Sequence, residues 1–231
     1  MRFEFLGEVP RRTFSGLAEL RPSTSSLVID PTSHPGLRGS ACSLADQAEY
    51  WAGEARRASP GPFIVMGYCS AASLALTLAE KLDGTVLGVL LFDPLTVTPE
   101  FTASSVRDVL ASAGVAAGDR GTGALTEIEA TLTGHENSGL RFLPEEIRSE
   151  LVEQYMRWLA FVHASSGVSA PTTLPFPLHL FWSDPAFVDG FSGGAAADSA
   201  QVIESNAVAL LSHERVEEVF LSATHPGKSE T

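Results

Sequence analysis

The sequence predicts an α/β fold in which a mostly parallel sheet carries helices on both faces. Short apolar runs at residues 26–30, 63–67 and 86–92 are bounded by turn residues, which is typical of buried parallel strands. Segments with helical spacing, 46–58 and 71–82, lie between these runs. Strands and helices that alternate with short links indicate a parallel sheet with right-handed crossovers.

Weaker elements extend the predicted sheet toward both ends of the chain. Residues 3–6 form a short apolar run that predicts a strand, and residues 13–20 have a weak helical spacing. Later in the chain, the pattern predicts a strand at 177–182, a helix at 200–211 and a last strand at 216–221.

A long helical segment interrupts this alternation. Between about residues 99 and 170 no strong strand pattern occurs, and helical spacing is clearest at 143–161. We interpret 99–170 as a helical lid inserted into a single domain that spans residues 1–231, because such insertions commonly cover an active site.

Composition argues against several classes of function. The 231 residues carry a formal net charge of −13, so nucleic acid and anionic membrane are not expected as main partners. No stretch of about 18 apolar residues predicts a membrane span, and no signal-peptide run begins the chain. Two cysteines, Cys42 and Cys69, make neither a disulfide framework nor a zinc motif. We therefore expect a cytoplasmic protein without a metal or redox cofactor.

The segment around Cys69 has the pattern of a nucleophile elbow. Such an elbow is a sharp turn between a strand and a helix, and it needs small residues two positions before and after the nucleophile, here Gly67 and Ala71. Cys69 would lie at a helix N-terminus, which lowers the pKa of a thiol, and the N–H of Ser70 would donate to a developing oxyanion. The alternative is a buried, inert cysteine in a strand–helix turn.

A thiol nucleophile needs a base and a third group that orients the base. Among the six histidines, His225 follows the last predicted strand, at the edge where the carboxyl ends of parallel strands converge. His34, which follows the predicted strand 26–30, is its competitor. Asp93 and Asp184 each end an apolar strand, and either fits the acid by its order in the chain. The alternative for each aspartate is a turn cap.

These segments resemble the thioesterases of nonribosomal peptide and polyketide synthesis, which have the α/β-hydrolase fold. The resemblance covers most of residues 3–100 and 175–227. It is carried by the helix–strand–elbow–helix segment ADQAEYWAGEARRASPGPFIVMGYCSAASLALTLAEKLDG, by the strand GVLLFDP and by the segment SATHPG.

The resemblance implies a triad of Cys69, His225 and Asp93. It favours Asp93 as the acid because GVLLFDP is similar to the strand that delivers the family's acid. Some standalone members place the acid near Asp184, which stays the alternative. The resemblance also implies an acyl or aminoacyl substrate presented on the phosphopantetheine of an acyl- or peptidyl-carrier protein.

Three features depart from the family pattern. Cysteine replaces the usual serine, the chain stops six residues after His225, and Leu6–Pro10 replaces the family's glycine-rich loop after the first strand. The second oxyanion donor is therefore expected at the N–H of either Gly7 or Glu8. An acyl group on cysteine stays a thioester, so its exchange with pantetheine is nearly isoenergetic. Such chemistry suits transfer to a second carrier or an amine better than hydrolysis.

Two other functions fit the same residues. The Gly-Tyr-Cys elbow also resembles that of dienelactone hydrolases, small enzymes with a Cys/His/Asp triad that would act on a lactone without a carrier. A hydrolase fold can also serve as an inactive binding module. Because carrier proteins are usually acidic, docking to this acidic chain would need a local basic patch. The candidates are the pairs Arg11/Arg12, Arg56/Arg57 and Arg141/Arg148.

Overall fold

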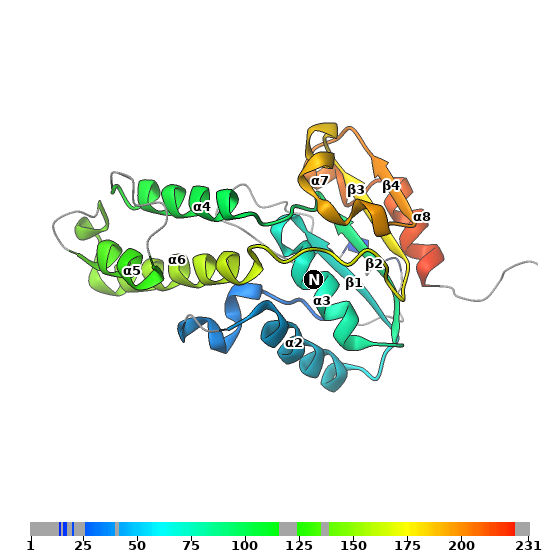
Figure 1. Ribbon diagram of the computed structural model, residues 1–231, viewed down its shortest axis with the longest axis horizontal. Helices are drawn as coiled ribbons and strands as arrows, with labels where there is room; N and C mark the ends of the chain where they lie inside the picture. Colours follow the sequence, from blue (N-terminus) through cyan, green and yellow to red (C-terminus); the bar gives the residue numbers. More distant parts are fainter. Residues whose placement is uncertain are drawn as a thin grey trace, which may run out of the picture. The chain divides into compact units, whose positions relative to one another are not determined.

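The computed structural model describes residues 14, 16–17, 20, 26–39, 42–115, 124–134 and 139–224 (Figure 1). They divide into two compact units. One, the sheet unit, takes its residues from 1–31, 44–96 and 168–231. The other, the helical unit, takes its residues from 32–43 and 97–167.

The sheet unit is built on parallel strands in the order β1-β2-β3-β4. The strands are β1 (Phe63–Tyr68), β2 (Val86–Phe92), β3 (Leu178–Trp182) and β4 (Ser199–Val202). Tyr68 pairs with Phe92, and Phe92 pairs with Phe181 on its other side. The carboxyl ends of β1, β2 and β3 therefore lie next to one another, and the residues that follow these strands share one edge of the sheet.

Helices cover both faces of this sheet (Figure 1). On one face α3 (Ala72–Leu82) packs against β1 and β2, and α2 (Leu44–Ala58) packs against α3. On the other face α8 (Glu214–Ala223) buries Val216 and Phe220 against Leu90 and Phe92 of β2. The two faces differ because side chains alternate along a strand. A short helix, α7 (Ala207–Leu210), precedes α8.

The helical unit has its own buried core. Its helices are α4 (Pro99–Ser112), α5 (Leu125–Thr133) and α6 (Glu145–Ser165), and α6 packs against both of the others. Val106, Leu110, Leu132 and Leu159 lie at the centre of this core, each nearly inaccessible to solvent. Figure 1 shows α4 and α6 side by side. The lid function that the sequence predicts for 99–170 stays a prediction.

Single 3-10 turns complete the described elements. They are η1 (Pro31–Ser33), η2 (Pro35–Gly39), η3 (Cys69–Ala71), η4 (Gly139–Phe142), η5 (Pro185–Gly190) and η6 (Ser192–Ala196). Within the residues that the structure describes, no helix is long and apolar enough to cross a membrane.

The predicted central elements are confirmed. The strands expected at 63–67, 86–92 and 177–182 are β1, β2 and β3. The helices expected at 46–58 and 71–82 are α2 and α3. The helical pattern at 143–161 is α6, which begins at Glu145 and continues to Ser165.

Three predicted elements are wrong. Residues 26–30 form no strand, and Val28 is 55% exposed although it belongs to an apolar run. Residues 216–221 form a helix, since their buried residues Val216 and Phe220 are four positions apart. The helix expected at 200–211 begins instead as the edge strand β4, whose exposure alternates with the period of two of a strand. The strand expected at 3–6 lies outside the described residues.

Candidate functional site

Cys69 lies on the turn between β1 and α3, directly after the strand ends. It begins the turn η3, which leads into α3 without a break. Its φ of 52° is in the left-handed region, which costs a residue with a Cβ roughly 1–2 kcal/mol. Strain of this kind persists only where the surrounding structure imposes it, and it is concentrated at functional sites.

The small residues of the elbow are required by close packing. A Cβ on Gly67 would lie 2.8 Å from the Cβ of Ala75 in α3 and 3.0 Å from Cδ2 of Leu91 in β2. The Cβ of Ala75 cannot move without displacing α3, so the strand and this helix approach too closely for a side chain at position 67. Ala71 is fully buried. The structure therefore has the strand–turn–helix geometry that the sequence predicts around Cys69.

The environment of the Cys69 thiol raises its pKa. Burial of this half-buried side chain is the main cause, and the negative charge of Asp93 adds to it. The N–H of Ser70 donates to the sulfur and lowers the pKa, but it does not compensate for burial. The lowered pKa expected at a helix N-terminus is therefore not found. At neutral pH the thiol is protonated, and nucleophilic attack requires a base.

Asp93 lies beside the elbow, at the residue that follows β2. Its φ of 42° is also left-handed, and its side chain is buried. The N–H of Asp93 donates to the Phe181 carbonyl at 2.8 Å, and the N–H of Leu95 donates to the Cys69 carbonyl at 3.2 Å. These backbone bonds hold the turn after β2 against the elbow after β1.

Three groups donate hydrogen bonds to the Asp93 carboxylate. The N–H of Ser183 donates to Oδ1 at 2.6 Å, and the Ser183 hydroxyl lies 2.9 Å from both oxygens. The Tyr68 hydroxyl is the third donor. Burial raises the pKa of Asp93, whereas the bonds from Ser183 and Tyr68 lower it. The pKa of Tyr68 is also raised, first by burial and then by the charge of Asp93, so the phenol stays a neutral donor.

Tyr68 and Ser183 are site residues that local sequence patterns do not predict. Ser183 is 90 residues from Asp93 in the chain, and only the pairing of β2 with β3 brings the two together. The sequence held one signal for them, because each residue directly follows the carboxyl end of a predicted central strand.

Asp184, the alternative acid, has a different role. It is exposed, and its Oδ1 accepts from the N–H of Ala186 at 2.8 Å at the start of η5. This is the turn-capping role that the sequence analysis gave as the alternative for each aspartate. The geometry thus separates the two aspartates, with Asp93 buried beside Cys69 and Asp184 on a solvent-exposed turn.

Two histidines lie in the described part of the sheet unit, and both have structural partners. Nδ1 of His179, inside β3, is 2.8 Å from the hydroxyl of Ser199 in β4. Nδ1 of His213 accepts from the N–H of Arg215 at 3.2 Å and caps α8. The competitor His34 belongs to the helical unit, where its Nδ1 lies 3.0 Å from the N–H of Gly36 and 3.3 Å from Sγ of Cys42.

His225 lies outside the described residues, as do Gly7 and Glu8. The end of α8 nevertheless bears on the prediction for His225. Ala223 lies beside Gly88 in the first half of β2, with its Cβ 3.8 Å from the position of a Cβ there. Gly88 is about 16 Å along the strand from Asp93. Helix α8 therefore ends near the opposite edge of the sheet from Cys69, and the approach of His225 to the thiol stays a prediction.

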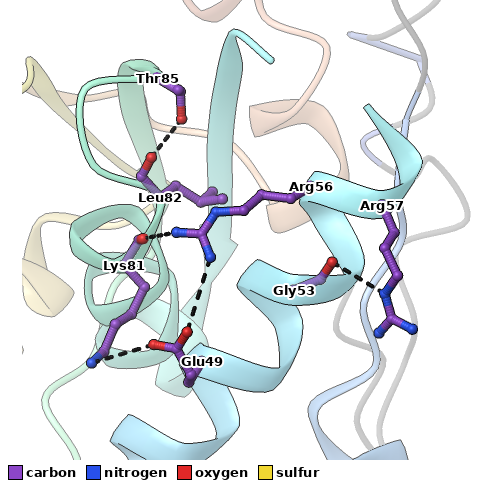
Figure 2. A network of polar contacts seen from close by, with 7 residues as sticks. All are labelled: Glu49, Gly53, Arg56, Arg57, Lys81, Leu82 and Thr85. Carbon is purple, nitrogen blue, oxygen red and sulfur yellow. Dashed lines mark hydrogen bonds and ion pairs between the residues drawn. The ribbon is translucent and has the colours of Figure 1, made fainter. Parts of the chain in front are cut away.

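Both residues of the basic pair Arg56/Arg57 make polar contacts with neighbouring residues of the chain (Figure 2). Arg56 donates to the carbonyl of Lys81 and lies 3.9 Å from Glu49, which also pairs with the Lys81 ammonium at 3.6 Å. Arg57 donates to the Gly53 carbonyl at 3.3 Å. It also pairs with Glu54.

The other two basic pairs were also predicted as candidates for a carrier-docking patch. Arg141 lies over the ring of Phe142 at 4.6 Å, and Arg148 lines a pocket between α5 and α6. Arg11 and Arg12 lie outside the described residues. Among the residues with coordinates, no three His, Cys, Asp or Glu side chains gather as metal ligands would.

No model of a known protein family matches the chain, and no curated protein matches it in sequence. Solved structures do resemble it. The NocB thioesterase domain from the nocardicin cluster is 18% identical with a TM-score of 0.50, and the match covers 91% of this chain and 85% of that one.

Two further structures are more distant. The RedJ thioesterase of the prodiginine pathway in Streptomyces coelicolor is 13% identical with a TM-score of 0.43, over 79% of this chain and 71% of that one. A thermophilic esterase from Thermogutta terrifontis is 16% identical with a TM-score of 0.45, over 78% and 71%. At 18% identity, the likeness to the NocB domain shows a shared fold and no more. With its parallel sheet, its helices on both faces and its likeness to the NocB domain, the chain has the α/β-hydrolase fold.

Proposed function

We propose that the chain is a thioesterase-like enzyme that accepts an acyl or aminoacyl group onto Cys69 from the phosphopantetheine thioester of a carrier protein. One observation carries the proposal. Cys69 occupies a strained elbow with the Ser70 N–H directed at its sulfur, and the buried Asp93 lies at the neighbouring strand end. The name of the NocB domain, a thioesterase of a biosynthetic cluster, supports the class of substrate.

The proposed reaction begins with removal of the thiol proton by His225, which Asp93 orients. The Cys69 thiolate attacks the thioester carbonyl and a new C–S bond forms. The carbonyl oxygen becomes an oxyanion, to which the Ser70 N–H donates a hydrogen bond. The N–H of Gly7 or Glu8 is the second donor. Collapse of the intermediate breaks the bond to pantetheine, whose sulfur takes the proton from the imidazolium. The acyl group then passes to a second carrier thiol, an amine or water.

Intact-protein mass spectrometry tests the covalent step. The protein is mixed with an acyl-carrier protein loaded with an acetyl group, and the adduct is mapped by peptide digestion. A Cys42→Ser background is needed, because Nδ1 of His34 lies 3.3 Å from Sγ of Cys42 and makes that thiol a second reaction site. We expect an adduct on Cys69 and none in Cys69→Ala. Normal turnover by Cys69→Ala would overturn the proposal.

The identity of the base is tested separately. In the same background, the pH dependence of Cys69 alkylation by iodoacetamide is compared among wild type, His225→Ala and His34→Ala. We expect His225→Ala to slow alkylation at neutral pH about a hundredfold, the usual contribution of a general base, and His34→Ala to have no effect. The reverse result would assign the base to His34.

An inactive binding module is the second candidate function. It is favoured by the raised pKa of the half-buried Cys69 thiol and by the end of α8 near the opposite edge of the sheet. The same alkylation measurement separates the two functions. A native Cys69 that reacts more slowly at neutral pH than the unfolded chain, in every histidine variant, is what an inactive module predicts.

A further inference from the structure

The Asp93 carboxylate has room for one more donor. An ionised carboxylate offers about four lone-pair positions to hydrogen-bond donors. The Ser183 N–H, the Ser183 hydroxyl and the Tyr68 hydroxyl together fill three of them. A fourth donor, such as an imidazole N–H, would complete the set. The existing donors restrict the direction from which that group approaches.

The carboxylate and its donors come from three neighbouring strands. Tyr68 ends β1, Asp93 follows β2, and Ser183 follows β3. Because these strands are paired in register, the carboxylate is fixed with respect to the sheet rather than to a loop. Ser183 is itself buried, 8% exposed, so water does not replace its hydroxyl readily.

We propose that Ser183 is a positioning residue, which holds the Asp93 carboxylate ionised and turned toward the catalytic base, with Tyr68 as the supporting donor. The inference rests on the proposed function, since it assumes that Asp93 orients a base for Cys69. It assigns to Ser183 a role in the reaction although this side chain touches neither substrate nor sulfur. The Ser183 hydroxyl acts by stabilising one protonation state and one orientation of Asp93.

The first test measures the carboxylate directly and needs no substrate. The pKa of Asp93 is followed by carbon-13 NMR of aspartate-labelled protein, with Asp93→Asn to assign its signal. We expect the midpoint to move to higher pH in Ser183→Ala and to return in Ser183→Thr, which keeps the hydroxyl. Tyr68→Phe, a milder change in a half-buried side chain, is expected to move it in the same direction. Unchanged midpoints in Ser183→Ala and Tyr68→Phe would overturn the inference.

The second test measures turnover of an acetyl-pantetheine thioester. Ser183→Ala is expected to lower kcat about tenfold, as for one lost hydrogen bond to a charged group, with KM unchanged. The acidic limb of the pH profile moves to higher pH, and Ser183→Thr restores both. A role in folding alone would lower the amount of active protein without moving the limb.

The two proposals fail in different ways. If Cys69→Ala retains turnover, the proposed function fails, whatever the NMR titration shows. If Cys69→Ala is inactive while Ser183→Ala has the kcat and pH profile of the wild type, only the positioning role of Ser183 fails.

Discussion

Two residues of the site, Cys69 and Asp93, have backbone conformations that residues with a Cβ rarely adopt. Within the described chain, the third residue of this kind is Asp83, in the turn that follows α3. Both site residues directly follow a central strand, where a sharp turn brings the side chain to the sheet edge. The strain is thus located where the elbow and the buried acid are formed, as expected when stability is given up for a functional geometry.

Replacement of Asp93 by asparagine is expected to stabilise the protein at neutral pH and to abolish its activity. Burial raises the pKa of Asp93 above that of the unfolded chain, so the folded state binds the proton more tightly. The free energy of unfolding therefore decreases as pH rises through the interval between the two pKa values. Asparagine has no such ionisation.

Denaturant unfolding of wild type and Asp93→Asn over a range of pH checks this prediction. The variant should be the more stable at neutral pH, and the difference should shrink as pH falls through the pKa of Asp93. Turnover should fall by at least about a hundredfold. A variant that is less stable at every pH would show that the charge of Asp93 contributes to folding.

Alanine at position 67 is expected to lower the free energy of unfolding, whereas alanine at position 53 is expected to raise it. Gly67→Ala forces a Cβ to within 2.8 Å of Ala75 and 3.0 Å of Leu91, which should cost about 1–3 kcal/mol in the free energy of unfolding. Gly53→Ala is the matched control, because Gly53 lies inside α2 with no atom within 4 Å of its new Cβ. It should stabilise the protein by about 0.5–1 kcal/mol.

Chemical denaturation of the two alanine variants gives both values. Equal effects of the two substitutions would contradict the close approach of β1, β2 and α3 at the elbow.

At the scale of elements, local patterns predicted three strands of the sheet unit, two of its helices and the elbow between β1 and α3. The strands β1 to β3 are continuous apolar runs, and α2 and α3 have clear helical spacing. The prediction of a strand at 216–221 was wrong because the period was misassigned. The apolar residues at 216, 219 and 220 fit the spacing of a helix better than that of a strand.

The hydrogen-bond partners of Asp93 could not be predicted from local patterns. Tyr68 and Ser183 meet Asp93 only because β1, β2 and β3 pair in register, and Ser183 is 90 residues away from Asp93 in sequence. A single sequence carries local periodicity but no information on which polar residues meet after folding. The local pattern therefore predicted Cys69 as a candidate nucleophile and two aspartates as candidate acids, and it missed the donors that contact Asp93.

Helix α4 of the helical unit has a cap that can be tested as an element. Thr98 precedes Pro99, and its hydroxyl accepts from the N–H of Phe101 at 3.2 Å. Thr98→Ala should lower the free energy of unfolding by about 1 kcal/mol, since it leaves that N–H without its partner. Thr98→Ser keeps the acceptor and should differ little from wild type. A thermal unfolding series of the three proteins decides the matter, and an alanine variant as stable as the serine variant would contradict the cap.

At the scale of the whole molecule, the net negative charge disfavours association with the proposed carrier protein. The formal net charge is −13, and carrier proteins are usually acidic as well. The pair Arg56/Arg57 does not offer a ready docking patch, because its guanidinium groups are paired with Glu49 and Glu54. Two like-charged proteins associate slowly at low ionic strength, since repulsion acts over the Debye length of about 10 Å at 0.1 M salt.

Salt should therefore favour the reaction with a carrier-borne substrate. We expect KM for acetyl-carrier protein to fall severalfold between low salt and about 0.3 M salt, where the Debye length is well under 10 Å. KM for the small, uncharged acetyl-pantetheine thioester should stay constant, which makes it the control for any effect of salt on the enzyme itself. Steady-state kinetics at several salt concentrations provide both values. A KM for the carrier that rises with salt would indicate attraction, and would mean that a local basic surface outweighs the net charge of the molecule.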